Sequence, residues 1–228
     1  MTRFVVVMGA DTDVGKTFVT EALARLLSRD RRVVAIKPFE SGASEGAGDG
    51  ERLAAATGQV APTHALVRLR APLAPAVAAD REGVIVDFAK LVGEIRSLAS
   101  EADIALVEGA GGLLSPLTWT HDALHLAHDL DATVVLVASD RLGTLSATHA
   151  AVQVLLDTRL LPTAIVLSGP KVPDASTGTN AAALRRRLQP YAHVAERIVE
   201  LPRTDGTIAI DLLVPVAAWL DGAPLSSV

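Results

Sequence analysis

Phe4-Val-Val-Val-Met-Gly-Ala-Asp-Thr-Asp-Val-Gly-Lys-Thr17 decides the fold of this 228-residue chain. Its first five residues are continuously apolar, as in a strand buried on both faces, and a polar, glycine-containing segment follows directly. Beyond it, Val19, Leu23, Leu26 and Leu27 recur at helical spacing. A strand that leads through such a loop into a helix offers backbone N–H groups and a helix N-terminus to a phosphate. The stretch therefore predicts a nucleotide-phosphate-binding loop.

The side chains of this loop suit that chemistry. Gly9 and Gly15 permit close approach of the backbone. Lys16 can reach the outer phosphates, and the Thr17 hydroxyl is placed to bind Mg²⁺. The usual motif would put its first glycine at Ala10, one residue later than it stands here. The alternative is a Gly-Lys-Thr turn that only caps a helix, and the strand–loop–helix context favours the phosphate site.

Strand-like apolar runs alternate with helical patterns along the chain. This alternation predicts an α/β fold with a doubly wound, mostly parallel sheet, helices on both faces and a P-loop NTPase-like architecture. We find no linker-like composition, so residues 1–228 are expected to form a single nucleotide-binding domain. The segment Glu40–Gly50 is glycine-rich and polar, which favours a mobile active-site loop. The expected strands are Phe4–Met8, Val33–Ile36, Ile104–Val107, Thr133–Val137 and Ala164–Leu167, and the expected helices are Thr17–Ser28, Val86–Ala99, His121–Leu130 and Ser146–Leu156.

Composition excludes several classes of function. A net charge of −5 and a pI near 5.7 argue against a nucleic-acid-binding protein. The absence of cysteine excludes disulfides, thiolate metal sites and a cysteine nucleophile. No apolar run approaches the ~18 residues of a membrane span, and the N-terminus does not read as a signal peptide. The expectation is a cytoplasmic protein that binds neither nucleic acid nor membrane.

An acidic residue ends the third apolar run. Asp103-Ile-Ala-Leu-Val-Glu108 is a strand pattern that ends in a carboxylate, and Gly109-Ala-Gly-Gly112 comes next. In a phosphate-loop protein an acidic residue at such a strand end reaches the magnesium ion, directly or through water. The alternative is that Glu108 caps a turn, and its pairing with the phosphate loop makes that the weaker interpretation.

Three motifs together resemble the dethiobiotin synthetase family of biotin biosynthesis. They are Asp11-Thr-Asp-Val-Gly-Lys-Thr17, Lys37-Pro-Phe-Glu-Ser-Gly42 and Val107-Glu-Gly-Ala-Gly-Gly112. The phosphate loop of that family also has its first glycine one residue early. The resemblance implies an ATP-dependent cyclo-ligase that uses Mg²⁺. In that family 7,8-diaminopelargonic acid reacts with CO₂ to give a carbamate, ATP phosphorylates the carbamate, and the neighbouring amine displaces phosphate. The family pattern also implies a homodimer.

The resemblance assigns roles to residues of the three motifs and of the segments around them. Lys37, Lys16 and Thr12 resemble the catalytic residues, and Thr17, Asp49 and Glu108 resemble the magnesium ligands. Asp49 stands in Gly48-Asp49-Gly50, which is also a common turn sequence. Further nucleotide contacts are implied for Asp13, Val14, Gly15, Gly111, Ser168 and Pro202, and substrate contacts for Ser41, Pro72, Gly143 and Thr144, the last two across the dimer interface.

Two segments depart from the family pattern. Ser146-Ala147 replaces the usual Asn-His, which puts the contacts to the substrate carboxylate in doubt. The fifth core strand ends Leu167-Ser-Gly-Pro170 instead of in an asparagine followed by an acidic residue that reads adenine. The preferred nucleoside triphosphate is therefore left open.

Some alternatives remain at this point. His121, His125 and His128 would lie on one face of the expected helix, where a transition-metal site is possible but packing is favoured. A related amidoligase such as a cobyrinic acid amidase is disfavoured, because the chain has no second domain and no cysteine for a glutaminase. A partitioning-type ATPase usually carries an additional lysine early in the loop, where this chain has Ala10-Asp11.

Overall fold

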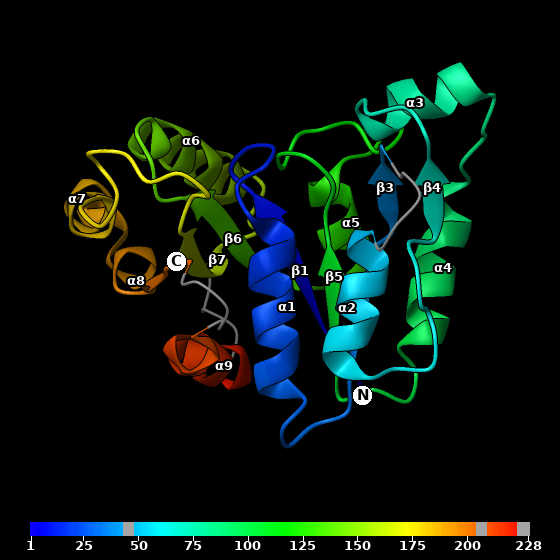
Figure 1. Ribbon diagram of the computed structural model, residues 1–228, viewed down its shortest axis with the longest axis horizontal. Coiled ribbons are helices and arrows are strands. Elements are labelled where there is room, and N and C mark those ends of the chain that lie inside the picture. Colours follow the sequence, from blue (N-terminus) through cyan, green and yellow to red (C-terminus); the bar gives the residue numbers. More distant parts are fainter. Residues whose placement is uncertain (43–47, 204–208, 223–228) are drawn as a thin grey trace.

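The computed structural model describes residues 1–42, 48–203 and 209–222. These residues form a six-stranded, fully parallel sheet in the order β2-β5-β1-β6-β7-β8 (Figure 1). A second sheet, β3-β4, has two strands. The strands are β1 (Arg3–Gly9), β2 (Val33–Ile36), β3 (Phe39–Ser41), β4 (Val67–Leu69), β5 (Ile104–Glu108), β6 (Thr133–Ser139), β7 (Pro162–Ser168) and β8 (Ile198–Leu201).

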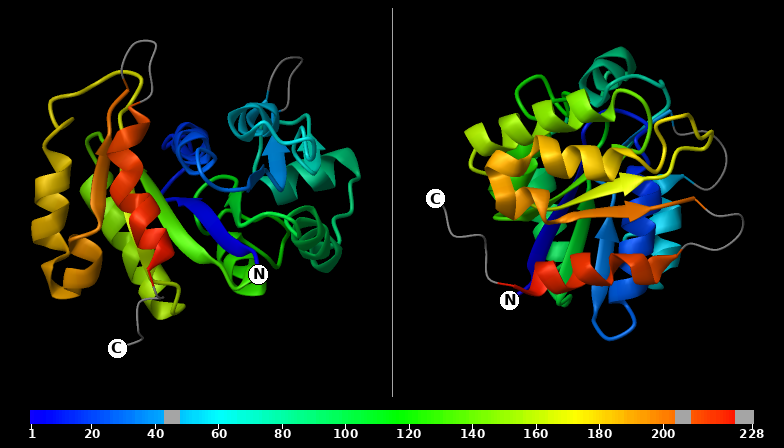
Figure 2. Two further views of the ribbon diagram at one scale, coloured as in Figure 1. Left: turned by 90° about the horizontal axis from the view of Figure 1, so that it is seen from below. Right: turned by 90° about the vertical axis from the view of Figure 1, so that its left-hand side faces the viewer.

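Helices cover both faces of the large sheet, as Figure 2 shows from two directions. Helices α1, α2 and α9 pack on one face, and α4 to α8 pack on the other. None of the described helices is both long and apolar enough to cross a membrane. The helices are α1 (Lys16–Leu27), α2 (Asp49–Thr57), α3 (Pro75–Glu82), α4 (Phe88–Leu98), α5 (Ala123–Leu130), α6 (Thr144–Asp157), α7 (Asn180–Arg187), α8 (Ala192–Ala195) and α9 (Val214–Asp221), with 3₁₀ helices η1 (Gln189–Tyr191) and η2 (Ile210–Leu213).

The two helical layers explain why the strands are apolar throughout. In β1, Val5 and Val7 join the core beneath α1, whereas Val6 and Met8 join the core on the opposite face, and none of the four side chains is exposed. Both sets of alternating positions are therefore buried, as expected of a central parallel strand. The predicted doubly wound α/β fold is confirmed, and the five predicted strands match β1, β2, β5, β6 and β7.

The segment Glu40–Gly50 is not the single loop that its composition suggested. Glu40 and Ser41 belong to β3, which pairs with β4, and Asp49 and Gly50 begin helix α2. Residues 43–47 lie outside the described part of the chain. The prediction was wrong at both ends of the segment, because strand pairing and helix packing outweigh its glycine content.

The predicted helix at His121–Leu130 begins two residues late. Its N-cap is Asp122, whose side chain accepts hydrogen bonds from the backbone N–H groups of Leu124 and His125. His121 precedes the cap, and its ring stacks on Phe88 with the ring centres 4.1 Å apart. The shared helical face predicted for His121, His125 and His128 was therefore wrong.

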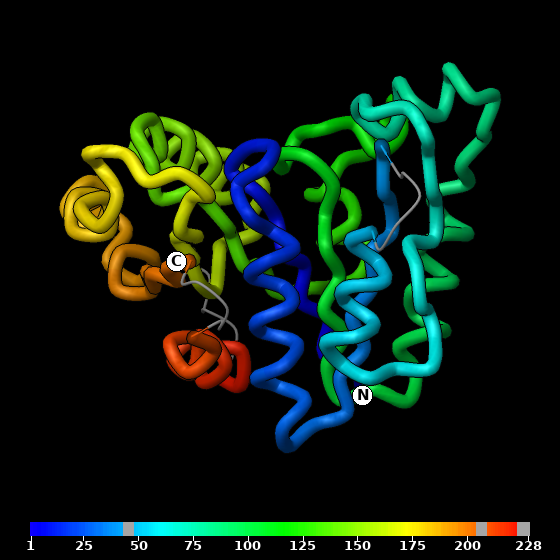
Figure 3. Tube along the Cα trace, viewed as in Figure 1, coloured from blue at the N-terminus to red at the C-terminus, as the bar shows by residue number. Residues whose placement is uncertain are grey.

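The carboxyl ends of the central strands bring the predicted motifs together. The loop after β1 lies beside the segment after β5 (Figure 3), and the Leu113 N–H donates to the Gly9 carbonyl oxygen at 3.0 Å. Val7 pairs with Glu108 in the sheet register, and Lys37 directly follows β2, the neighbour of β5. In a parallel α/β sheet this edge is where ligands bind.

Candidate active site

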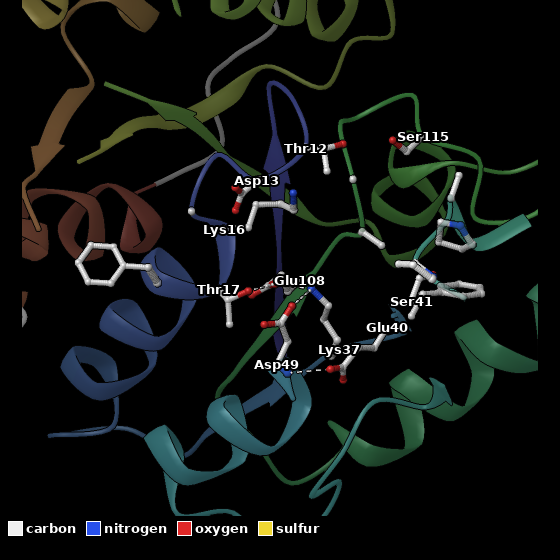
Figure 4. A pocket seen from close by; sticks show the side chains of 18 of the residues that line it. Thr12, Asp13, Lys16, Thr17, Lys37, Glu40, Ser41, Asp49, Glu108 and Ser115 are labelled. Carbon is white, nitrogen blue, oxygen red and sulfur yellow. Dashed lines mark hydrogen bonds and ion pairs between the residues drawn. The ribbon is translucent and has the colours of Figure 1, made fainter. Parts of the chain in front are cut away.

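A cavity of about 620 Å³ opens at this edge of the sheet. Most of the residues predicted for the site line it, as Figure 4 shows. They are Thr12, Asp13, Gly15, Lys16, Thr17, Lys37, Ser41, Asp49, Pro72, Glu108 and Gly111.

The phosphate loop closes tightly around the end of β1. A side chain at Gly9 would place its Cβ 2.6 Å from the Asp11 carbonyl oxygen and 3.0 Å from Lys16 Nζ. Gly15 adopts a positive φ of 91° immediately before α1. The early glycine therefore has a steric reason, because the loop folds back onto the last residue of the strand.

Lys16 lies under the loop with 7% of its surface exposed. Burial, together with the nearby charge of Lys37, lowers its pKa to about 8. Two cationic side chains that face one cavity repel one another, and an anion bound between them offsets that repulsion. The phosphates of a nucleotide are such an anion.

Lys37 makes a buried ion-pair cluster with two carboxylates. Its Nζ lies 2.5 Å from Glu108 Oε1 and 2.9 Å from Asp49 Oδ2. Thr17 Oγ1 donates to the same Glu108 oxygen at 2.8 Å. Three residues from α1, α2 and β5 thus meet the lysine that follows β2, although the four are up to 91 positions apart in sequence.

Electrostatics fix the charge states in this cluster. Burial alone would lower the pKa of Lys37, but the neighbouring charges of Glu108 and Asp49 outweigh it and raise that pKa. Burial would likewise raise the pKa of Asp49, but the Lys37 ammonium outweighs it and lowers that pKa. Lys37 is therefore an ammonium and Asp49 a carboxylate at neutral pH.

The cluster also has the donor chemistry of a magnesium site. Asp49, Glu108 and Thr17 offer only oxygen atoms, which Mg²⁺ prefers. Glu108 Oε2 is buried and has no hydrogen-bond partner in the described part of the chain. A buried carboxylate oxygen without a partner is costly, and a divalent cation would satisfy it. The residues present therefore fit Mg²⁺.

Comparison with known proteins agrees with this geometry. A family model described as an AAA domain matches residues 3–209. The ATP-dependent dethiobiotin synthetase BioD of Anaeromyxobacter sp. (strain Fw109-5) is 40% identical over 210 residues, which cover 86% of this chain and 93% of that protein. BioD of Corynebacterium diphtheriae, also named as an ATP-dependent dethiobiotin synthetase, is 36% identical over 186 residues, 80% of this chain and 82% of that protein.

The chain belongs to the dethiobiotin synthetase family. The predicted family is thereby confirmed. The predicted class of enzyme, an ATP-dependent ligase, is confirmed as well, because these relatives are named ATP-dependent synthetases. The hydrogenase maturation factor HypB of Archaeoglobus fulgidus shares the fold, with a TM-score of 0.55 at 18% identity over 96% of this chain and 91% of that one. The septum site-determining protein MinD of Pyrococcus horikoshii, complexed with Mg-ADP, has a TM-score of 0.51 at 17% identity over 96% and 93%.

In this member of the dethiobiotin synthetase family, one wall of the cavity is less polar. Phe39, Pro72, Leu73 and Pro75 line it beside Ser41. Ser41 Oγ is buried and has no hydrogen-bond partner among the described residues. Such a wall suits a ligand with an aliphatic part and a few polar groups.

Five predicted contact residues do not line this cavity. Val14 lies on the other side of the phosphate loop, in a second cavity of about 190 Å³. Ser168 is buried beneath Gly15, and the exposed Pro202 lies against Gly169, the residue that follows Ser168. Gly143 is the N-cap of helix α6 and Thr144 is its first residue, and neither lines either of these two cavities.

The structure adds residues that the family motifs did not indicate. Arg203 lines both cavities, its guanidinium lies over the Phe18 ring at 4.4 Å, and its Nε donates to the Gly169 carbonyl oxygen at 2.9 Å. Arg52 follows Asp49 by three positions on α2, a spacing that places them together on one helical face. No comparable spacing in the sequence indicated Arg203, since it follows Pro202 in a segment without helical or strand periodicity.

Proposed function

We propose that this chain forms the cyclic urea of dethiobiotin from 7,8-diaminopelargonic acid, CO₂ and ATP. The observation that carries this proposal is Lys37, which stands between the phosphate loop and the less polar wall of the cavity. A lysine in that position can hold a carbamate and a γ-phosphate together. Membership of the dethiobiotin synthetase family supports the same reaction.

The reaction needs three bond-forming steps. An amine nitrogen of the diamine forms a C–N bond to CO₂ and releases a proton, which gives a carbamate. A carbamate oxygen then attacks the γ-phosphorus of ATP, and ADP leaves. The second amine attacks the carbamoyl carbon, inorganic phosphate leaves, and the ring closes. Each step depends on position and charge neutralisation more than on covalent chemistry by the protein.

The residues of the cavity divide this work. Lys16 and the loop N–H groups between Thr12 and Thr17 bind the phosphates, and the helix N-terminus of α1 adds positive potential. Lys37 neutralises negative charge as it develops on the transferring phosphoryl group. Ser41 and Pro72 contact the diamine on the less polar side.

Thr17, Asp49 and Glu108 would hold Mg²⁺ in this proposal. When bound, Mg²⁺ supplies charge neutralisation at the β- and γ-phosphates. Glu108 is the central member, because it already contacts Thr17 and Lys37 through one oxygen and keeps the other unpaired among the described residues. Mg²⁺ is therefore the expected cofactor, with ATP as co-substrate.

The second cavity is the proposed place of the nucleoside. It adjoins the phosphate loop at Asp13, Val14 and Gly15, and Gly169 and Arg203 also line it. Ser168 and Pro202 flank Gly169 and Arg203 and would act through them. We further propose that the chain is one domain and works as a homodimer, in which Gly143 and Thr144 of one subunit receive the substrate carboxylate of the other.

A phosphate-release assay tests the proposal. The purified protein is incubated with 7,8-diaminopelargonic acid, bicarbonate, Mg²⁺ and each nucleoside triphosphate in turn, and dethiobiotin is measured by mass spectrometry. We expect phosphate release that requires the diamine and equals dethiobiotin in amount. Phosphate release without the diamine would contradict the proposal and would favour a partitioning-type ATPase.

A further inference from the structure

Helix α2 carries a proposed magnesium ligand at its first residue but lacks a capping side chain of its own. Asp49 follows the N-cap residue Gly48, which has no side chain that could cap the helix. The first N–H groups of any helix need acceptors from outside the helix. The position of Asp49 therefore depends on the group that accepts a hydrogen bond from its backbone N–H.

Glu40 on β3 supplies that acceptor. Its Oε1 accepts a hydrogen bond from the Asp49 N–H at 3.0 Å (Figure 4). Its Oε2 accepts one from the Gly50 N–H at 3.5 Å. Glu40 is buried, with 9% of its surface exposed. A carboxylate at a helix N-terminus is stabilised by the helix dipole, and charge-assisted hydrogen bonds are stronger than neutral ones.

The glycine before Asp49 belongs to the same arrangement. A side chain at Gly48 would place its Cβ 2.0 Å from Glu40 Oε1 and 2.8 Å from Glu40 Cδ. The φ of Gly48 is −79°, which other residues adopt freely, so a side chain there is opposed by the present position of the Glu40 carboxylate and not by backbone conformation. The sequence Gly48-Asp49 is therefore fitted to the Glu40 carboxylate.

The other end of Asp49 faces the reaction site. Glu40 holds the backbone N–H of Asp49, and the Asp49 carboxylate reaches Lys37 Nζ at 2.9 Å. A shift of the helix start would move this carboxylate directly, since Asp49 is the first residue of the helix. Partners that orient a metal ligand typically change metal affinity 10- to 100-fold when they are removed.

We propose that Glu40 is a positioning residue that caps α2 and thereby holds the Asp49 carboxylate for the cation. The inference rests on the proposed role of Asp49 as a magnesium ligand. Glu40 also lines the main cavity. Direct contact with the diamine is therefore the competing role, and the test must separate the two.

The test measures Mg²⁺ binding by calorimetry on the full chain saturated with ATP and without the diamine. Glu40→Ala is expected to weaken Mg²⁺ binding by about 10-fold or more. Glu40→Gln, which keeps an acceptor oxygen, is expected to recover most of the loss. The KM for the diamine should change less than about twofold in either variant, because the proposed role acts through Asp49.

A matched control removes a helix cap away from the cavity. Asp87 caps α4 by accepting a hydrogen bond from the Lys90 N–H at 2.9 Å. Asp87→Ala removes a similar cap and should leave Mg²⁺ affinity unchanged. A loss of Mg²⁺ affinity in this control would assign the Glu40 effect to general stability and would overturn the proposal.

A second variant keeps the proposal falsifiable if Glu40→Ala does not fold. Gly48→Ala leaves Glu40 in the chain but displaces its carboxylate, and it should weaken Mg²⁺ binding similarly. Wild-type Mg²⁺ affinity in Gly48→Ala or in folded Glu40→Ala would overturn the inference, as would a raised diamine KM with unchanged Mg²⁺ affinity. If the proposed reaction is wrong, the wild-type protein will show no diamine-dependent phosphate release. The Mg²⁺ binding measurements do not depend on that reaction, so the two failures can be told apart.

Discussion

The Lys37 ammonium and the Glu108 carboxylate form a buried ion pair, with 2.5 Å between Nζ and Oε1. Lys37 is 5% exposed and Glu108 is fully buried. Removing one partner of such a pair leaves a buried charge and usually costs about 3–5 kcal/mol of stability. The pair therefore links Lys37, the proposed phosphoryl-transfer lysine, to the proposed metal site both structurally and energetically.

Lys37→Met tests the catalytic half of this pair. It keeps most of the side-chain volume but removes the charge, so diamine-dependent phosphate release should fall at least about 1,000-fold. ATP affinity, measured by calorimetry, should change much less, because Lys16 and the loop amides remain. Lys90→Met, at an exposed lysine on α4, is the control and should have full activity. Wild-type turnover in Lys37→Met would remove Lys37 from the reaction.

Glu108→Gln tests the proposed role of Glu108 as a magnesium ligand. The amide retains the shape of the side chain but loses its charge, so we expect Mg²⁺ to bind about 10-fold or more weakly to the ATP complex. Mg²⁺ titration of phosphate release gives this value. The matched change Glu94→Gln lies on the exposed side of α4 and should leave the titration unchanged. Equal Mg²⁺ dependence in both variants would argue against Glu108 as a ligand.

Gly15→Ala tests the fit of the phosphate loop. Its φ is 91°, and a Cβ would lie 2.3 Å from Ser168 Oγ. Gly83 also has a positive φ, of 66°, but a Cβ there would have no atom of the described residues within 4 Å. Both variants carry backbone strain of order 1 kcal/mol, and only Gly15→Ala adds a collision. ATP affinity should fall in Gly15→Ala and remain normal in Gly83→Ala, and similar affinities would contradict this account.

Arg203→Ala tests the wall between the two cavities. The guanidinium lies against Phe18, and Nη2 would be 3.5 Å from a Cβ at Gly15, so the charge stands beside the phosphate loop. Loss of a charge-assisted contact there should weaken ATP binding by about 10-fold or more. Arg81→Ala, at an exposed position on α3, should not. Equal loss of affinity for all nucleoside triphosphates would indicate contact with phosphate, whereas unequal loss would indicate contact with the base.

Subunit mixing tests the proposed homodimer. Lys37→Met and Gly143→Pro each damage a different part of the site, and each variant alone should be inactive. If Lys37 and Gly143 of one site come from different subunits, a mixed dimer contains one intact site. Co-refolding equal amounts should then restore activity in about a quarter of all sites, by the arithmetic of random two-fold pairing. Recovery no greater than the sum of the single variants would contradict a shared site.

The sequence by itself determined the fold and which side chains gather at one edge of the sheet. Continuous apolar runs separated by helical patterns suffice for a doubly wound sheet, because strands buried on both faces must be apolar throughout. Each run also marks where a strand ends, so Lys16, Lys37 and Glu108 could be assigned to one edge before any distance was known. The three motifs then supplied the family.

Only the tertiary structure decided how these residues are held. Glycine content suggested a loop around Asp49, but packing against Glu40 makes the residue the first of a helix. Arg203 reaches the phosphate loop from the segment that follows β8, a strand that pairs with β7. Contacts of this kind join positions far apart in the chain and depend on side-chain direction and close packing, which local patterns of residue type do not encode.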